Sequence, residues 1–330
     1  MKIDSRSPNL SFGIFLTIGA YLCFALAASI VRILDVRIPT TQILFMQSII
    51  SVIFITPIFI KKRLFRVKKE LIKLHLIRSL SGVGNFFCYF LAIKQLNLVD
   101  ATVLAYTAPF YTPIIWMFLA KEKKTEKGIW WTIVLGFIGI TLILKPTQTL
   151  LKAGSMIGIT AGILGSIALV SIRLLNQKTE SLIRTLFYYF FISTLLTAPF
   201  AILNWFHPTN SEWMFLISIG VLTAFAQLLL TTAYMHGTAS FLSPISYSMI
   251  IFTGLISSIF LKQIPGYLSL IGTVLIIIGG SISYIIKVKP VKFIEIFEHP
   301  PEEKIHFWRK VRLRHHHIEV HKNQNNMKKD

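Results

Sequence analysis

Long apolar stretches alternate with short polar links along most of the chain. An α-helix needs roughly 20 apolar residues to cross about 30 Å of hydrocarbon, and ten stretches approach that length. They run from Ser11 to Val31, Thr41 to Ile60, Leu76 to Ile93, Ala101 to Ala120, Ile129 to Leu144, Ser155 to Ile172, Leu186 to Leu203, Trp213 to Tyr234, Ala239 to Leu261 and Gly266 to Ile286. The pattern predicts an all-α membrane protein with ten transmembrane helices.

The first stretch also has features of a secretory signal peptide. Lys2 and Arg6 precede it, and the small residues from Ala25 to Ser29 are typical of a cleavage site. However, the stretch is as long as a full span, and small residues also let membrane helices pack closely. The sequence therefore favours a retained first span, with a cleaved leader as the alternative.

The composition agrees with a membrane protein. Of the 330 residues, 54% are hydrophobic and 15% are charged, and the formal net charge is +20. A nucleic-acid-binding domain gathers its basic residues on one face or along one helix. Here they are clustered in the links between apolar stretches. We therefore expect membrane lipid around the helices and no nucleic-acid partner.

The placement of Lys and Arg predicts the orientation of the chain. With ten spans, the links and tails on the side of the two termini carry 28 of these residues, and the opposite links carry six. The six are Arg32, Arg37, Lys94, Lys145, Lys152 and Lys262. Because cytoplasmic links are enriched in Lys and Arg, both termini are predicted to be cytoplasmic.

The two halves of the chain resemble each other when the sequence is shifted by 141 residues. The shift pairs, among others, Gly13 with Gly154, Arg32 with Arg173, Ala92 with Ala233, Tyr106 with Tyr247, and Thr112 with Thr253. An odd number of spans in each half gives the halves opposite orientations, as in many secondary transporters. We therefore predict two inverted five-helix repeats, 11–145 and 155–286, with a linker 146–154 and tails 1–10 and 287–330.

Polar residues within the spans are the candidates for contact with a solute. A buried amide or hydroxyl needs a hydrogen-bonding partner or water. The predicted substrate-binding residues are Asn85 and Tyr89 on the third span, Thr102, Tyr106 and Pro109 on the fourth, Gln227 and Thr231 on the eighth, and Ser243 and Tyr247 on the ninth. Pro109 lacks a backbone donor and should bend its helix. The alternative is that these groups only bond one helix to another.

Charged residues are predicted at span ends and not in their middles. Arg32, Arg78 and Arg173 either extend toward the membrane surface or attract an anionic solute group at a cavity mouth. The sequence has no phosphate-binding loop and no recognised catalytic motif, so we expect no enzyme. Cys23 and Cys88 lie far apart without metal-ligand spacing, so we expect no metal and no cofactor.

One segment resembles a known family. Between Arg78 and Glu122 the chain reads RSLSGVGNFFCYFLAIKQLNLVDATVLAYTAPFYTPIIWMFLAKE, which resembles EamA-type members of the drug/metabolite transporter superfamily. The matching positions are Arg78, Gly82, Tyr89, Ala92, Ala101, Pro109 and Glu122. In the second half, Gln263 stands where the family usually has Glu, and Ile250 stands where Pro is frequent.

The resemblance implies ten helices in two inverted repeats around a central cavity, and transport by alternating access. The implied solutes are small organic metabolites such as amino-acid derivatives, S-adenosylmethionine, nucleosides or flavins. It also implies the cell inner membrane as the location. Two other functions remain open at this point: a non-transporting membrane scaffold, and a membrane enzyme that acts on lipid.

Two further features concern partners. Gly136, Gly139, Gly279 and Gly280 are spaced for close helix packing or a homodimer contact. The segment 287–330 is rich in Lys, Arg and His. Three interpretations of this segment remain: contact with anionic lipid, a metal-binding His tract, or a solvated tail.

Overall fold

A computed structural model describes residues 10–34, 37–120, 138, 153–236, 242–262, 266, 267, 270–275 and 278. All of them lie in the first of the two units into which the chain divides, Met1–Ile286. The helices are α1 (Leu10–Leu34), α2 (Thr40–Lys61), α3 (Lys69–Gln95), α4 (Leu98–Ala105), α5 (Ala108–Ala120), α7 (Ala153–Gln177), α8 (Leu182–Leu203), α9 (Asn210–His236), the 3₁₀-helix η1 (Ser243–Tyr247) and α11 (Ser248–Phe260). These residues form no β-strand.

Six of the helices are long and apolar enough to cross a membrane: α1, α2, α3, α7, α8 and α9. They coincide with the first, second, third, sixth, seventh and eighth predicted spans. The prediction of an all-helical, multi-span protein is therefore confirmed for the described residues. The fifth span (129–144) except residue 138, and most of the tenth (266–286), lie outside them, as do the linker residues 146–152 and the tails 1–9 and 287–330.

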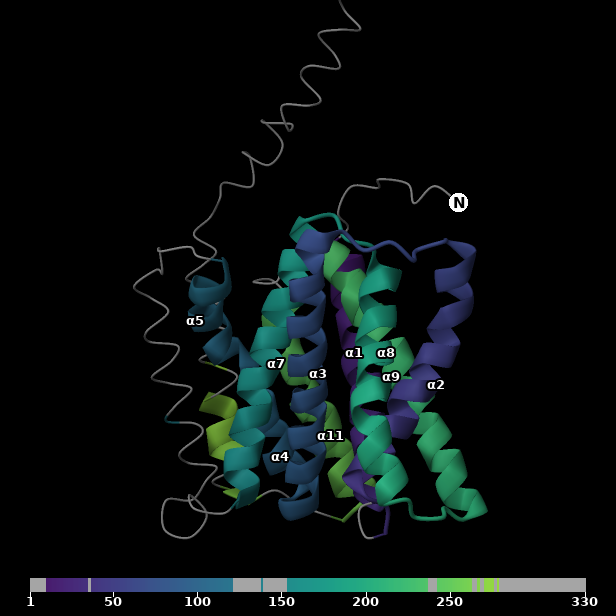
Figure 1. Ribbon diagram of the computed structural model, residues 1–330. Helices are drawn as coiled ribbons and strands as arrows, with labels where there is room; N and C mark the ends of the chain where they lie inside the picture. Colours follow the sequence, from purple (N-terminus) through teal and green to yellow (C-terminus); the bar gives the residue numbers. More distant parts are fainter. Residues whose placement is uncertain are drawn as a thin grey trace, which may run out of the picture. The chain divides into compact units, whose positions relative to one another are not determined.

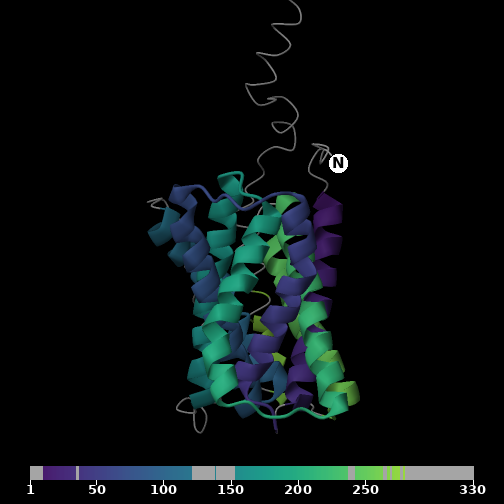
Figure 2. The same ribbon diagram turned by 45° about the vertical axis from the view of Figure 1, so that its right-hand side comes forward.

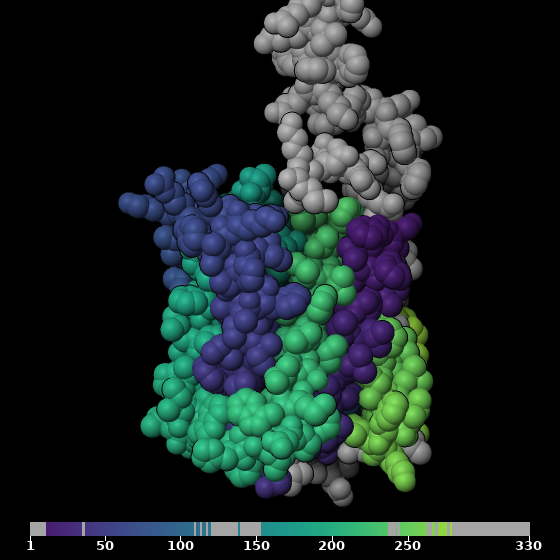
Figure 3. Space-filling model, turned by 90° about the vertical axis from the view of Figure 1, so that its right-hand side faces the viewer, coloured from purple at the N-terminus to yellow at the C-terminus, as the bar shows by residue number. Residues whose placement is uncertain are grey.

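The spanning helices lie side by side in Figures 1 and 2. The main packing pairs are α3 with α7, α1 with α9, and α2 with α8. In Figure 3, α1 (purple) lies between α9 and α11 (both green), and α1 contacts both helices. Large side chains such as Phe15, Phe118 and Leu203 are exposed on the outside of the helices. In a membrane this apolar exterior faces lipid.

The ends of the helices define two sides. At one side the ring of Phe12, near the start of α1, lies 5.1 Å from the ring of His236 at the end of α9. The links 62–68 and 178–181 are also on this side, which we call the Leu10 side (Figure 1). At the other side, Gln42 exchanges two hydrogen bonds with the backbone of Phe206, at 2.8 and 3.0 Å. We call it the Phe206 side.

The fourth predicted span is not one helix, and this corrects the sequence analysis. It is divided into α4 and α5, with Tyr106 and Thr107 in the turn between them. Pro109 has no N–H to donate to the carbonyl of Ala105, so the α-helical ladder cannot continue through it. Pro109 is the second residue of α5, where a missing donor costs little. The expected single face of Thr102, Tyr106 and Pro109 is therefore interrupted.

The ninth predicted span is divided in the same region. Its described part begins at Leu242, continues as η1, and becomes α-helical in α11. A 3₁₀-helix turns about 120° per residue and an α-helix about 100°, so the side chains of η1 point in directions that α-helical periodicity does not predict. Tyr106 and Tyr247, which the 141-residue shift pairs, both lie where the span is divided: Tyr106 in the turn between α4 and α5, and Tyr247 at the change from η1 to α11.

Glycine brings α9 close to α2. A Cβ atom placed on Gly220 would lie 2.6 Å from Ile50 Cβ, too near for any real contact. Gly220→Ala should therefore push the two helices apart and lower the free energy of unfolding by about 1–3 kcal/mol. Gly254→Ala in α11 is the control, because nothing lies within 4 Å of its Cβ position. Equal denaturant midpoints for the two purified variants would contradict this account of the α2–α9 contact.

Candidate functional site

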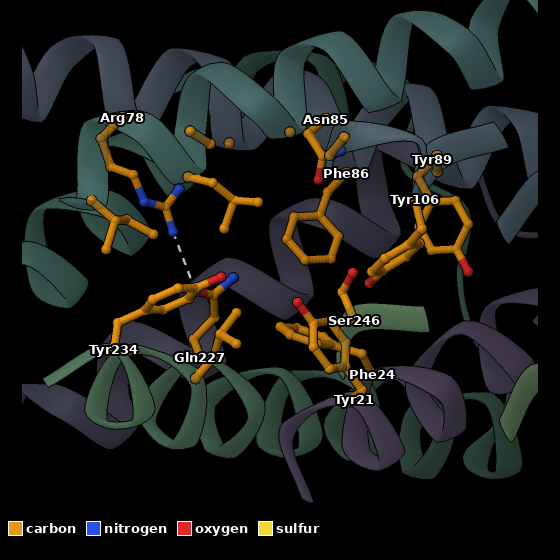
Figure 4. A pocket seen from close by; sticks show the side chains of 18 residues that line it. Tyr21, Phe24, Arg78, Asn85, Phe86, Tyr89, Tyr106, Gln227, Tyr234 and Ser246 are labelled. Atoms are coloured by element: carbon orange, nitrogen blue, oxygen red, sulfur yellow. Dashed lines mark hydrogen bonds between the residues drawn. The ribbon is translucent and has the colours of Figure 1, made fainter. Parts of the chain in front are cut away.

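A cavity of about 80 Å³ lies between α1, α3, α7, α9, the α4–α5 turn and η1 (Figure 4). Its lining combines aromatic rings, small residues and a few polar groups. The lining residues are Tyr21, Phe24, Arg78, Gly82, Asn85, Phe86, Tyr89, Ala105, Tyr106, Ala108, Gly165, Ala168, Leu169, Ile172, Gln227, Leu230, Tyr234 and Ser246. A largely apolar wall with a few convergent polar groups is typical of small-molecule sites.

Arg78 supplies the cation of this lining. Helix α3 begins at Lys69, seven residues before the predicted start of the span, so Arg78 lies inside the helix and is only 3% exposed. Its Nη2 donates to Oε1 of Gln227 over 3.2 Å, and its guanidinium carbon lies 4.1 Å from the centre of the Tyr189 ring. Arg78 is the only charged residue in the lining.

Gly82 makes room for this arrangement. It lies one turn after Arg78 on α3, and a Cβ atom there would collide with Arg78 Nη1 and lie 2.7 Å from Tyr189 Cε2. A side chain at this position would displace the guanidinium or the ring beneath it. The absence of a side chain at Gly82 therefore leaves room for the guanidinium over the Tyr189 ring at the edge of the cavity.

Asn85 lies two turns beyond Arg78 on α3. Its Nδ2 donates to the carbonyl of Ala161 on α7 over 2.7 Å, and Gly165 permits this close approach. The amide oxygen points toward the cavity in Figure 4. Asn85 therefore joins two helices through its nitrogen and offers an acceptor to a solute through its oxygen.

Tyrosines form the other part of the lining. The Tyr106 ring lies 5.8 Å from that of Tyr21 and 6.1 Å from that of Tyr89, both in edge-on geometry. The Tyr89 hydroxyl shares a 2.7 Å hydrogen bond with Thr102 Oγ1, and Thr102 also donates to the carbonyl of Leu98. Because Thr102 is fully buried, it fixes the Tyr89 ring without touching the cavity.

A group of ionisable side chains lies on the Leu10 side, beginning at His75 about one turn from Arg78. The Glu180 carboxylate accepts from Arg184 Nη1 at 2.6 Å, and its other oxygen lies 3.8 Å from His75 Nε2. Arg184 also donates to the carbonyl of Leu64, and Tyr188 donates to that of Phe65. These contacts join the ends of α3, α7 and α8 to the link 62–68.

The structure brings together part of the predicted site. Tyr106, Asn85, Tyr89 and Gln227 line the cavity, and so does Arg78. Thr231 is buried and donates to the carbonyl of Gln227. Tyr247 is buried among Val99, Val103, Leu104, Phe110 and Ile250 instead. The side chains of Ser243 and Pro109 lie outside the described part of the chain.

The other two predicted arginines are not in the lining. Arg32 Nη1 donates to the carbonyl of Ile93 over 2.5 Å, which joins the ends of α1 and α3 on the Phe206 side. The Arg173 guanidinium lies 4.0 Å from the centre of the Trp116 ring. Of the three arginines predicted at a cavity mouth, only Arg78 reaches the cavity.

The sequence analysis missed other lining residues. Ser246 takes the place expected for Tyr247, because η1 is not α-helical. On α1, Tyr21 was only a weaker candidate by its sequence, and Phe24 and the lining residues of α7 were missed, since helices that are apolar nearly all round give no signal of which face is inward. Gly165 and Ala168 carry no polar group that could have marked them. Among the described residues, no three His, Cys, Asp or Glu side chains could hold a metal ion together.

Six apolar spanning helices, four of which line a cavity with polar groups, define a multi-pass membrane protein with a compartment between its helices. The EamA-like transporter family matches residues 11–145 and 152–285, and the chain belongs to this family. It is a membrane transporter of small molecules and not an enzyme. This outcome decides against the two alternatives, a scaffold and a lipid-acting enzyme.

Similar proteins include both exporters and importers. The chain is 26% identical over 272 residues to the pseudopaline exporter CntI of Pseudomonas aeruginosa, covering 82% of this chain and 95% of that one. It is 22% identical over 251 residues to an S-adenosylmethionine uptake transporter of Rickettsia prowazekii, covering 74% and 83%. A protein of known crystal structure has the same fold, with a TM-score of 0.61, 17% identity, and coverage of 85% of this chain and 98% of that one.

Proposed function

We propose that the chain is a secondary carrier that moves a small organic metabolite across the cell inner membrane by alternating access. The observation that carries this proposal is the cavity itself, because helices from both halves of the chain enclose it and Arg78, Asn85, Gln227 and tyrosines face into it. Amino-acid derivatives, S-adenosylmethionine-like compounds, nucleosides and flavins are the solute classes to test first.

The packing of the helices supports two inverted repeats. The 141-residue shift relates α1 to α7, α2 to α8, α3 to α9, and α4 with α5 to η1 with α11. The main contacts between the halves then have counterparts. The contact of α3 with α7 corresponds to that of α9 with α1, and the contact of α3 with α8 to that of α9 with α2. Helix α7 contacts α4 and α5 as α1 contacts η1 and α11. We propose that ten helices complete this arrangement.

The size of the cavity supports a change of conformation during transport. Sites for small molecules have volumes of about 300–1,000 Å³. The present cavity of about 80 Å³ is smaller, so a metabolite fits only when the helices around it move apart. Within the cycle, Tyr106, Tyr89, Asn85 and Gln227 contact the solute. Thr102 and Thr231 hold their neighbours in place.

The remaining predicted positions have roles of the same kind in the proposed cycle. Pro109 and Gly254 give the divided helices their flexibility, and Ser243 and Tyr247 are the second-repeat counterparts of Thr102 and Tyr106.

The orientation of the chain is supported by the link 62–68 on the Leu10 side. This link is basic, containing Lys62, Arg63, Arg66 and Lys68, which supports a cytoplasmic Leu10 side and cytoplasmic termini. A homodimer through the glycines of the fifth and tenth spans stays a prediction.

The experiment that tests the carrier uses the purified full-length protein in detergent. Thermal unfolding is followed with amino acids, nucleosides, flavins and S-adenosylmethionine. A compound at a hundred times its Kd should stabilise the protein by about 2.7 kcal/mol. Uptake of that compound into proteoliposomes then distinguishes transport from binding. A folded protein that no compound stabilises and that transports none would contradict the proposal.

Asn85→Ala should weaken binding of the stabilising compound about tenfold. The variant removes one buried hydrogen-bonding group, which is worth about 1–2 kcal/mol, and 1.4 kcal/mol is a factor of ten in Kd. Asn204→Ala is the matched control, since Asn204 is exposed at the end of α8 and donates to the carbonyl of Phe200. If the two variants bind the compound equally well, Asn85 is not part of the site.

A further inference from the structure

We propose that the solute carries a single carboxylate and that Arg78 binds it. This inference rests on the proposed carrier function and names the class of solute. The first argument is charge. Arg78 is 3% exposed, and no described carboxylate lies within 4.0 Å of its guanidinium. Burying a charge without a counter-ion costs several kcal/mol. The site therefore needs an anion.

Glu180, the acidic group that contacts His75 one turn from Arg78, is already engaged. One oxygen of Glu180 accepts from Arg184 and from the backbone N–H of Ser181, and the other faces His75. Gln227, the hydrogen-bond partner of Arg78, is neutral and leaves the charge uncompensated. The anion that balances Arg78 must therefore come from outside this part of the protein.

The second argument is the hydrogen-bond donors of the Arg78 guanidinium. A guanidinium carries five N–H donors in one plane. Nη2 donates to Gln227, the guanidinium carbon lies over the Tyr189 ring, and the buried Nε has no hydrogen-bond partner. Nη1 lies against Gly82, in the space that a side chain there would fill. A planar carboxylate that accepts two parallel hydrogen bonds matches this geometry.

The single cation selects among anions. One carboxylate neutralises Arg78 completely, whereas a phosphate group carries about −1.5 to −2 at pH 7 and would leave excess negative charge in a buried site. A cationic solute is disfavoured for the opposite reason, because the described lining contains Arg78 and no acidic residue. The charge of the lining therefore favours monocarboxylates.

The rest of the cavity restricts the remainder of the solute. Asn85 lies seven residues beyond Arg78, about 10 Å along α3. Tyr89 and Tyr106 lie beyond it, on the opposite part of the lining from Arg78 and Gln227 in Figure 4. A solute that reaches both parts is elongated. Its carboxylate binds Arg78. Its other end is planar or aromatic, carries a hydroxyl or an amide, and packs among the tyrosines.

The test uses three probes with the same ring and chain length: 3-(4-hydroxyphenyl)propanoate, its primary amide, and tyramine. Their Kd values are measured by isothermal titration with the purified full-length protein. A second set is indole-3-propanoate, its amide and tryptamine. In at least one set we expect the carboxylate to bind at least tenfold more tightly than the amide, and the amine to bind most weakly.

The variants assign this preference to Arg78. Arg78→Gln should bring the carboxylate-to-amide ratio of Kd values close to one. Arg78→Lys keeps the charge without the paired donors and should retain part of the preference. Arg37→Gln is the matched control: Arg37 lies on the Phe206 side with its side chain 58% exposed, and its loss should leave the ratio unchanged. The wild-type ratio tests the inference even if Arg78→Gln fails to fold.

Three results would overturn the inference. In the first, neither carboxylate binds more tightly than its amide. In the second, the preference survives in folded Arg78→Gln. In the third, a neutral or cationic compound is transported equally well by the wild type and by Arg78→Gln, which leaves the carrier intact and removes only the carboxylate. If no compound from either set or from the metabolite screen binds or is transported, the carrier proposal fails as well.

Discussion

Ala168→Phe should reduce transport at least a hundredfold while the protein remains folded. Ala168 lies on α7, is 7% exposed and lines the cavity. A phenyl ring at this position projects into a space of about 80 Å³ and occupies it. Because that space is not part of a close-packed core, the cost in stability should not exceed the roughly 1–3 kcal/mol typical of an added ring.

The measurement is uptake into proteoliposomes of the compound that stabilises the wild type. Ile163→Phe is the control, because Ile163 is also on α7 but is 38% exposed on the outside of the bundle. It adds a ring of the same kind where lipid accommodates it. If the two variants transport at similar rates, the solute does not pass through this cavity.

The second expected result concerns stability. Glu180→Gln should lower the free energy of unfolding by about 3 kcal/mol, because it leaves a partly buried Arg184 without its counter-ion. The Glu180 side chain is 1% exposed and that of Arg184 is 18% exposed, so solvent screens this pair only in part. The loss should also loosen the link 62–68, which Arg184 holds through the carbonyl of Leu64.

Chemical denaturation of the purified variants measures this effect. Glu212→Gln is the matched control: Glu212 lies 3.8 Å from the exposed Arg37 on the Phe206 side. An ion pair with an exposed arginine contributes little to stability, and the amide oxygen of Gln can still accept from the N–H and hydroxyl of Thr209, so this variant should have the denaturant midpoint of the wild type. Equal midpoints for Glu180→Gln and Glu212→Gln would show that the Glu180 contacts do not stabilise the Leu10 side.

The sequence predicted the long helices and several of their inward groups, for a physical reason. An amide such as Asn85 or Gln227 within an apolar span is costly unless it has a partner, so its presence indicates the interior. The depth of Arg78 was not predictable in this way. Lys69, Glu70 and Lys73 make the start of α3 polar, and a hydropathy pattern ends the span there although the helix continues.

The sequence also could not predict how the side chains of the two divided spans are oriented. Pro109 predicted a bend, but the turn at Tyr106 and Thr107 and the 3₁₀ geometry of η1 depend on tertiary contacts. Thr107 Oγ1, for example, donates to the carbonyl of Leu104 beside Gly162 of α7. A helical wheel drawn through the ninth span therefore places Tyr247 in the cavity and Ser246 outside it, the reverse of the structure.

The burial of Arg78 has an electrical consequence. A membrane potential does about 2.3 kcal/mol of work per 100 mV on each elementary charge that crosses it. In the proposed cycle, the empty site leaves the Arg78 guanidinium as a buried positive charge, and any movement of α3 through the field is driven or opposed by the voltage. A bound carboxylate would cancel that charge. Under the carboxylate proposal, the membrane potential therefore acts mainly on the return of the empty carrier.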